Sequence, residues 1–403
     1  MTVRLVQLSD LHLGRSFGGL GLPDEVCDQL ARSSLDAIRQ ACELTRERDA
    51  VALLIPGDLF DRPEVDEELT RHVQNLFGEL QRPVLVSPGN HDSYGPMSVW
   101  NNTALEKLGL APWPANVHIF STRTLTPRPL LDGELTVYGH RVEGYHSDSD
   151  SPLTGIAMAR CARWNVLLVH GALEGARWGR RTTVPFTACQ LAEIGSDYAA
   201  VGHYHRFRRI EHENRLLGAY AGTPVPGEID EDPHGGLLVV TLDKHGPEVE
   251  CVDVYPGRIA RMMVAGEPPF RDTDDTTMRI RLAAGENVLD EDDIVFVHLE
   301  GTSEQQLDPE VIQDRLQTHY RHVVVRDATE PPYLDSLSAT ADRTTIESQF
   351  VANLRQQIEP CDKPDRRAVL ESALKYGMLA LRGRAIRPAL VNEHEGAGAH
   401  DAD

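Results

Sequence analysis

Short runs of aliphatic residues recur along the first half of the chain, each ending in polar or turn-forming residues. Each run is too short for a helix and rich in branched side chains, so we predict strands that are buried on both faces. Five of these runs stand directly before clusters of polar residues, and they are Val3 to Leu8, Val51 to Ile55, Val84 to Ser87, Val166 to Val169 and Tyr198 to Val201.

Segments with helical periodicity lie between the predicted strands. Asp24 to Arg48 has a broad apolar side and acidic residues in its first turn, and Val65 to Leu80 predicts a second helix. Thr136 to His140 and Leu237 to Leu242 predict further strands. Strands that alternate with helices indicate an α/β sandwich with mixed sheets, in which the helices cover the sheets.

A domain boundary is expected near Tyr255-Pro256-Gly257, which divides 1–257 from a small α/β domain at 258–335. The pattern of this second part predicts strands at Thr277 to Leu282, Ile294 to Leu299 and His322 to Val325. It also predicts a helix that begins at Pro309 and runs to about Tyr320.

The segment 336–391 contains two predicted helices, Thr345 to Ile358 and Pro364 to Arg382, each with an apolar stripe. The stripes can pack on each other or on the body of the protein, or they can bind a partner. The last residues, 392–403, contain almost no large hydrophobic side chains and predict a disordered acidic tail.

Potential metal ligands follow the five strands. A single Asp-x-His or Gly-Asp usually marks a solvated turn, but the set is informative because strand ends of an α/β sheet meet at one edge. The blocks are Asp10-Leu11-His12, Gly57-Asp58, Gly89-Asn90-His91-Asp92, Val169-His170-Gly171 and Gly202-His203-Tyr204-His205.

The chemistry of these side chains suits a two-metal site. Residues i and i+2 of an extended segment point the same way, so Asp10 and His12 can share an ion, as can His203 and His205. Asp58 can bridge two ions with its two oxygens. Oxygen and nitrogen ligands without thiolate favour Mn, Fe or Zn over Ca, and two such ions lie about 3.5–4 Å apart. The six cysteines lack Cys-x-x-Cys spacing, and we expect most of them to be reduced and buried.

Three of the blocks resemble the calcineurin-like metallophosphoesterase superfamily, and within it the SbcD-type nucleases that repair DNA double-strand breaks. They are Ser9-Asp10-Leu11-His12-Leu13-Gly14, Gly57-Asp58-Leu59-Phe60-Asp61 and Gly89-Asn90-His91-Asp92. Tyr220-Ala221-Gly222-Thr223-Pro224 is also similar, although that family more often has Pro where Ala221 stands. The resemblance implies a four-layer αββα sandwich with mixed sheets.

The resemblance also implies the roles of individual residues. The first metal would be bound by Asp10, His12, Asp58 and His205, and the second by Asp58, Asn90, His170 and His203. Manganese is the expected metal, and a hydroxide that bridges the two ions would attack the phosphodiester. His91 would stabilise the transition state or protonate the leaving oxygen, and Asp92 could orient the His91 ring. Asp61 is either a supporting residue or a simple turn residue.

The formal net charge of −22 argues against a nuclease that binds DNA alone, because an acidic surface repels the polymer. Local basic clusters next to the ligands offer candidate substrate contacts, or are merely solvated loop arginines. They comprise Arg177, Arg180 and Arg181 after His170, and Arg206, Arg208 and Arg209 after His205. In the family that the chain resembles, a helical segment near the carboxyl end binds an SMC-like coiled-coil ATPase, which would supply DNA affinity. A homodimer is left open.

Two other functions are alternatives to a nuclease. A small-molecule phosphodiesterase acting on cyclic nucleotides or nucleotides would need no partner, and the segments after Gly257 argue against it. A catalytically silent scaffold should have lost ligands, whereas every ligand position is filled. No apolar run is long enough to span a bilayer, and the first strand leaves no room for a signal peptide, so we expect a cytoplasmic protein.

Overall fold

The computed structural model describes residues 2–142, 151, 153–154, 158–174, 184–229, 231, 235–330 and 345–381. The chain divides into two compact units, Met1–Ile259 and Ala260–Ala402. Each unit has a hydrophobic core of its own. The predicted tail at 392–403 and Arg177, Arg180 and Arg181 lie outside the described residues.

The first sheet has six strands and carries three of the five ligand blocks. Its order is β14 (Gly246–Val252), β13 (Leu237–Asp243), β1 (Val3–Gln7), β2 (Ala52–Ile55), β3 (Val84–Val86) and β4 (Val117–Ile119). The strands from β1 to β4 are parallel, whereas β13 is antiparallel to both β1 and β14. The sheet is therefore mixed.

The second sheet also has six strands and carries the two histidine blocks. Its order is β11 (Arg208–His212), β12 (Arg215–Tyr220), β10 (Tyr198–Gly202), β7 (Trp164–His170), β6 (Leu135–Gly139) and β5 (Thr126–Leu130). The four inner strands are parallel and the two edge strands are antiparallel to their neighbours. A short parallel pair, β8 (Ala172–Leu173) and β9 (Pro185–Phe186), follows the His170 strand.

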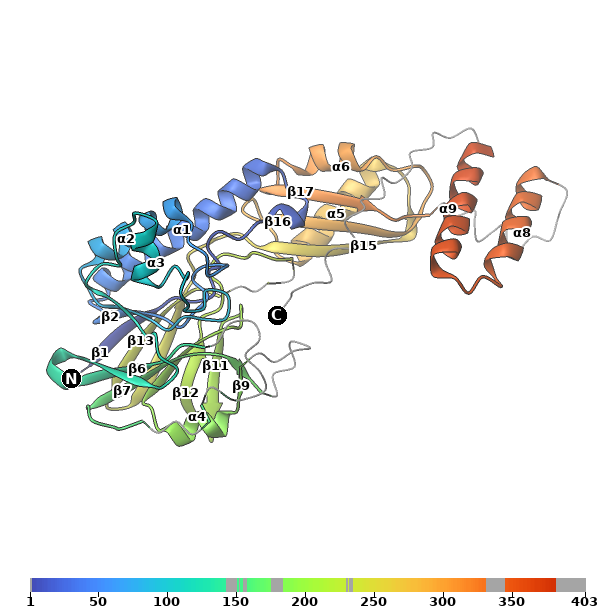
Figure 1. The fold of residues 1–403 in the computed structure, drawn as a ribbon. Coiled ribbons are helices and arrows are strands. Elements are labelled where there is room, and N and C mark those ends of the chain that lie inside the picture. Colours follow the sequence, from blue (N-terminus) through green and yellow to red (C-terminus); the bar gives the residue numbers. More distant parts are fainter. Residues whose placement is uncertain are drawn as a thin grey trace. The chain divides into compact units, whose positions relative to one another are not determined.

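The two sheets face each other across one core, and helices cover their outer faces (Figure 1). Leu5 and Leu54 of the first sheet and Leu168 and Ala200 of the second are completely buried in this core. Helix α1 (Asp24–Glu47) packs on β1, β2 and α2 (Glu67–Leu80), and the short helix α3 (Asn102–Lys107) lies between β3 and β4 in the chain. Helix α4 (Ala188–Ile194) packs on β11 and β12 of the second sheet. The predicted α/β sandwich with mixed sheets is confirmed.

Local chemistry explains where the two long helices begin. Helix α1 follows Pro23 and has acidic residues in its first turn, where the helix dipole favours negative charge. The side chain of Asp66 caps α2 by accepting a hydrogen bond from the backbone N–H of Leu69. Short one-turn helices occur at Gly18–Leu20 and Leu131–Gly133.

The second unit contains a three-stranded sheet with the order β15 (Ile259–Phe270), β16 (Ile294–Ser303) and β17 (His322–Asp327). Helix α5 (Thr273–Glu286) and helix α6 (Pro309–Leu316) contribute to its core. Strands β16 and β17 are parallel.

The predicted strand at Thr277 to Leu282 is wrong, because these residues lie inside α5. Met278, Ile280 and Leu282 alternate with polar residues, which is the pattern typical of a strand. Of the three only Ile280 is buried, while Met278 is 51% and Leu282 62% exposed. Asp272 caps the helix by accepting from the backbone N–H of Asp275, and this local signal decides the structure. The strand of this region is β15, which the prediction missed.

Helices α8 (Ile346–Ile358) and α9 (Pro364–Leu381) pack on each other around Val351, Ile358, Leu374 and Met378. Part of their apolar surface is exposed, since Ile346 is 74% and Val369 67% exposed. Within the described residues, no helix has both the length and the hydropathy needed to cross a membrane.

The cysteines are all free, as expected. The expectation that most are buried is wrong, because only Cys42 is buried, while Cys161, Cys189 and Cys251 are exposed.

Candidate metal centre

The predicted ligands meet where the carboxyl ends of five strands converge. Asp10, Asp58 and Asn90 follow β1, β2 and β3 of the first sheet. His170 and His203 stand at the ends of β7 and β10 of the second. Side chains more than a hundred residues apart in sequence therefore line one buried site.

A buried polar contact joins the two sheets directly beneath this site. The side-chain amide of Gln7, at the end of β1, donates to the carbonyl oxygens of Val201 and Ala219, at 3.1 Å each. The hydroxyl of Tyr198 donates to the Gln7 side-chain oxygen at 2.8 Å. Each polar atom of the Gln7 side chain is thus paired in the core, and the contact sets the position of one sheet edge against the other.

The backbone of the ligand loops differs from the extended geometry on which the prediction relied. Asp10, His12 and Asp58 have positive φ values of 54°, 49° and 51°, and His203 has a φ of 119°. The alternation argument for residues i and i+2 therefore does not hold here. Backbone hydrogen bonds between the loops hold this conformation, including one from His12 N to the Asp58 carbonyl oxygen at 3.0 Å.

Two glycines allow the ligand loops to approach closely. A Cβ atom at Gly57, whose φ is 97°, would lie 2.4 Å from Nδ1 of His170. A Cβ at Gly89 would lie 2.1 Å from Oδ1 of Asp58. Any larger residue at either position would displace a candidate metal ligand.

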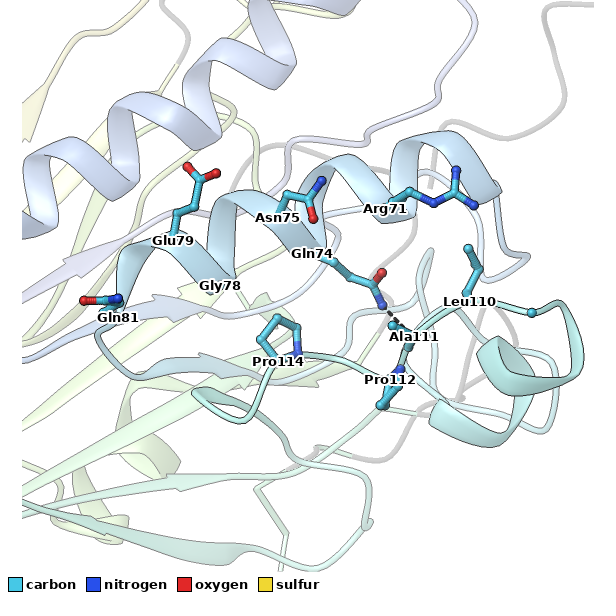
Figure 2. Close-up of a pocket in the computed structure, with 11 residues that line it drawn as sticks. Arg71, Gln74, Asn75, Gly78, Glu79, Gln81, Leu110, Ala111, Pro112 and Pro114 are labelled. Carbon is cyan, nitrogen blue, oxygen red and sulfur yellow. Dashed lines mark hydrogen bonds between the residues drawn. The ribbon is translucent and has the colours of Figure 1, made fainter.

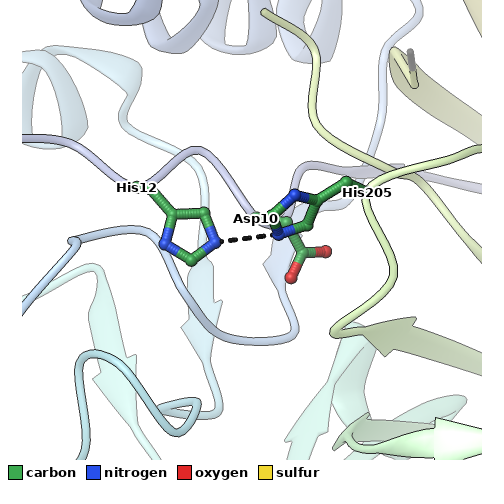
Figure 3. Close-up of side chains that lie close together, drawn as sticks. All are labelled: Asp10, His12 and His205. Carbon is green, nitrogen blue, oxygen red and sulfur yellow. Dashed lines mark hydrogen bonds between the residues drawn. The ribbon is translucent and has the colours of Figure 1, made fainter. Parts of the chain in front are cut away.

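The first ligand group comprises Asp10, His12 and His205. Figure 3 shows the rings of His12 and His205 turned toward each other beside the Asp10 carboxylate, with 3.1 Å between their Nε2 atoms. Oδ1 of Asp10 accepts from the backbone N–H of His203, while Oδ2 is buried without a hydrogen-bond partner. When both Nε2 atoms are unprotonated, their lone pairs point into the same space between the rings. Two ligands of one cation are arranged in this way.

The second ligand group comprises Asp58, His170 and His203. Nδ1 of His170 lies 2.9 Å from the carbonyl oxygen of Pro56 and donates to it, which assigns Nε2 to the site. That Nε2 atom lies 2.8 Å from Oδ1 of Asn90 and 3.2 Å from Oδ2 of Asp58. His203 and His205 thus fall into different groups, as the family resemblance implies, rather than sharing one ion as their i and i+2 spacing suggested.

A third group joins the first two, because His12 and Asp58 also lie close to His91. The backbone N–H of His91 donates to Oδ1 of Asp58 at 2.9 Å, and Nδ1 of its ring lies 3.2 Å from the carbonyl oxygen of Asp61. The Asp61 carboxylate lies 3.5 Å from Nδ1 of His12 and 3.9 Å from Nδ1 of His91. Asp61 therefore supports both histidines.

Asp92 supports the loops through backbone amides. Its two carboxylate oxygens accept hydrogen bonds from the N–H groups of Gly89, Asp58, Leu59 and Phe60, at 2.7–3.3 Å. The contact that we expected from Asp92 to the His91 ring is supplied by Asp61 in this structure. Asp92 holds the Asp58 loop against the Asn90 loop.

Burial and mutual charge shift the pKa values of the ligands. Burial raises the pKa of Asp10 to about 6, and it lowers the pKa values of His12 to about 4 and His203 to about 3. Burial acts against the charged forms of Asp58 and His170 as well. Their attraction outweighs it, so the pKa of Asp58 falls below its usual range and that of His170 rises to about 9. His12 and His203 are therefore neutral at neutral pH, as metal ligands must be, whereas His170 must lose a ring proton when a cation binds.

The residues present fit two divalent cations. A cation would complete three sets of contacts that the protein leaves incomplete. They are the unpartnered Oδ2 of Asp10, the facing Nε2 atoms of His12 and His205, and the oxygens of Asn90 and Asp58 next to His170. Asp58 belongs to groups on both sides, as a bridging carboxylate would. Carboxylate, amide and imidazole donors suit Mn, Fe or Zn.

Added metal is expected to stabilise the protein against heat. A cation that binds only the folded state contributes about 2.7 kcal/mol at a free concentration of 100 Kd. In a unit of this size that raises Tm by roughly 5–10 °C. Differential scanning fluorimetry of metal-free protein with Mn²⁺ measures the shift, and Ca²⁺ serves as the control, since it prefers all-oxygen sites. An unchanged Tm with Mn²⁺, Fe²⁺ and Zn²⁺ would contradict the site.

The basic residues after His205 are placed in or next to β11. Arg206 and Arg208 are partly exposed, and Arg209 donates to the carbonyl oxygen of Val249 at 3.0 Å. All three arginines are described candidates for substrate contact, and Arg209 is also attached to β14 through this hydrogen bond.

The residue that sequence reasoning missed is Glu231, which hydrogen-bonds to Nδ1 of His205. It lies in the acidic run Glu228-Ile229-Asp230-Glu231, where no periodicity or spacing distinguishes it from its neighbours. Only the contact with a ligand identifies it.

A separate groove of about 570 Å³ lies between α2 and the segment 109–114 (Figure 2). Gln74 donates to the carbonyl oxygen of Ala111 at 2.8 Å across it. None of its lining residues belongs to the three ligand groups, so the groove is separate from the metal centre.

Comparison with known proteins gives a family match and a curated relative. Residues 3–207 match the model of a protein family described as calcineurin-like phosphoesterase. A Bacillus subtilis (strain 168) protein named "Uncharacterized metallophosphoesterase YhaO" is 26% identical over 242 residues, which cover 58% of this chain and 56% of the relative. The chain thus matches little more than half of that relative's length.

Solved structures also resemble this chain at low sequence identity. A novel archaeal phosphodiesterase is 13% identical with a TM-score of 0.31, and the match covers 62% of this chain and all of that one. TT1561 of Thermus thermophilus is 12% identical with a TM-score of 0.37, covering 63% and 100%. GAP50 of Plasmodium is 13% identical with a TM-score of 0.38, covering 63% and 85%.

Proposed function

Because this chain belongs to the calcineurin-like phosphoesterase family, we propose that its metal centre hydrolyses the phosphodiester bonds of DNA, as a nuclease of SbcD type. Membership of the family makes the protein a metal-dependent phosphoesterase, a hydrolase that acts on phosphate esters. The observation that carries a two-metal centre is the position of Asp58 between the group of His12 and His91 and the group of His170 and His203.

The candidate ligands would hold two cations, which are needed for hydrolysis. Two divalent cations, when bound, supply an activated water molecule and neutralise the phosphate oxygens. Asp10, His12, Asp58 and His205 would hold the first cation, and Asp58, Asn90, His170 and His203 the second. We propose manganese as the native metal, with iron or zinc as the alternatives that this donor set accepts.

His91 is suited to contact the reacting phosphate. Its Nδ1–H is directed to the Asp61 carbonyl oxygen, which assigns Nε2 to the phosphate or to the leaving oxygen. Its side chain is 19% exposed, whereas those of His12 and His170 are essentially inaccessible. A substrate can thus reach His91 without any ligand being displaced.

Polymeric DNA as the substrate, and DNA repair as the role, are supported by the parts of the chain beyond the metal centre. A second unit with its own sheet and a helical pair follows the phosphoesterase unit, and Arg206 and Arg208 lie just beyond His205. The exposed apolar side chains of Ile346 and Val369 offer a surface for a partner helix. We propose an SMC-like coiled-coil ATPase as that partner, which would also compensate for the net charge of −22.

The test compares three substrates with Mn²⁺ present: linear duplex DNA, single-stranded DNA and bis-p-nitrophenyl phosphate. Native protein should cleave DNA in a metal-dependent reaction, more strongly once the candidate ATPase is added, and EDTA should stop it. Cleavage of the small ester while DNA stays intact, with the ATPase present, would overturn the proposal. It would favour a phosphodiesterase acting on cyclic nucleotides or nucleotides.

A further inference from the structure

Glu231 makes a contact that the chemistry described above does not use. One of its carboxylate oxygens hydrogen-bonds to Nδ1 of His205. The other accepts from the backbone N–H groups of Gly227 at 2.6 Å and Glu228 at 3.0 Å. Glu231 is only 7% exposed and Gly227 is buried, whereas His205 is partly exposed and Glu228 is exposed.

The segment that Glu231 holds also reaches the loop of another candidate ligand. Glu228 forms an ion pair with Arg15, with 3.1 Å between Oε1 and Nη2. The backbone N–H of Arg15 donates to the carbonyl oxygen of His12 at 3.1 Å. A continuous set of contacts therefore runs from His205 of one sheet to His12 of the other.

The direction of the hydrogen bond decides which nitrogen of His205 can bind a metal. An ionised carboxylate only accepts, so Nδ1 of His205 carries the proton and its Nε2 presents a lone pair. That Nε2 atom is the one that faces His12 in the first ligand group.

We propose that Glu231 is a positioning residue, which fixes the ring and tautomer of His205 and thereby sets the affinity of the first metal site. The inference deepens the proposed two-metal centre and rests on it. Supporting carboxylates of this kind typically change metal affinity by about 10–100-fold. Since Glu231 contacts no member of the second group in the described structure, the second site should keep its affinity.

Glu231→Gln separates this role from simple packing. If the Gln amide nitrogen faces His205, it donates to Nδ1 and forces the proton onto Nε2, which can then no longer bind a metal. If the amide turns over, its N–H groups face the N–H groups of Gly227 and Glu228, which are also donors. Either orientation harms the first site, although Gln preserves the shape of Glu. A packing role alone predicts the opposite, that Gln is the mildest replacement.

The experiment is a titration of metal-free protein with Mn²⁺, in which calorimetry gives the two affinities and elemental analysis gives the bound metal. Glu231→Gln and Glu231→Ala should weaken one site by about 10–100-fold and leave the other as in the native protein. Glu231→Asp, which keeps the carboxylate, should recover part of the loss. Glu248→Gln, which changes an exposed carboxylate of β14 outside this set of contacts, is the matched control and should bind both ions normally.

The outcomes are distinct. Native affinities at both sites in Glu231→Gln would overturn the role of Glu231 and leave the two-metal proposal intact. Equal weakening of both sites, or a Gln variant that is normal while Ala is not, would assign Glu231 to packing alone. Native protein that binds fewer than two Mn²⁺ ions would overturn the two-metal function itself. Circular dichroism of each variant checks that it is folded.

Discussion

Asp58→Asn is expected to reduce phosphodiester hydrolysis by at least about 10³-fold, equivalent to about 4 kcal/mol of activation free energy. Asp58 is 2% exposed and belongs to two ligand groups, one with His12 and His91 and the other with His170 and His203. Asn has the same shape but no negative charge, and it offers one oxygen in place of two. Both cations would lose their shared ligand.

Metal content distinguishes this expectation from a general loss of folding. Elemental analysis should find the metal of both sites reduced in Asp58→Asn, whereas His170→Ala should reduce only the second. Asp49→Asn is the matched control, because Asp49 has a similar φ of 48° but an 83% exposed side chain paired with Arg82. An Asp58→Asn variant that retained two tightly bound ions would disprove the bridging role.

His91→Ala is expected to slow DNA hydrolysis by about 10²–10⁴-fold while both metals remain bound. The substitution removes the imidazole but keeps the backbone N–H that donates to Asp58. The metal ligands should therefore keep their positions. Initial rates and metal content, measured on the same preparation, test both parts of the prediction.

The choice of substrate separates the two roles considered for His91. If the ring protonates the leaving oxygen, the loss should be much smaller for bis-p-nitrophenyl phosphate, because nitrophenolate leaves without a proton. If the ring stabilises charge on the phosphate, both substrates should suffer alike. His72→Ala, which removes an exposed histidine of α2, should leave both rates unchanged. Loss of metal in His91→Ala would instead make His91 a ligand.

Most strands and helices of the first unit could be predicted from the sequence, because the order of apolar and polar residues within each segment indicates which side chains are buried. A run such as Val84 to Ser87 is apolar on both faces, and only a strand covered on both sides accommodates it. The pattern failed at Met278, Ile280 and Leu282, where three alternating apolar residues lie in a helix. A short alternation does not distinguish a strand from a helix with one buried residue per turn.

The candidate ligands could be predicted from their positions directly after the predicted strands. Asp10, Asp58, Asn90 and His170 each follow a predicted strand, and parallel strands in a sheet end at the same edge. Position along the strand thus brought the right side chains to one place, although the expected extended backbone at Asp10 and His12 was wrong.

The sequence by itself therefore determined the α/β class and the set of side chains available for metal chemistry, because hydrophobic periodicity and residue type are local properties. Only the tertiary structure decided that Gln7 joins the two sheets, that Asp61 contacts the His91 ring, and that Glu231 holds His205. These are contacts between residues distant in the chain, and their geometry depends on how two sheets pack. No local pattern encodes it.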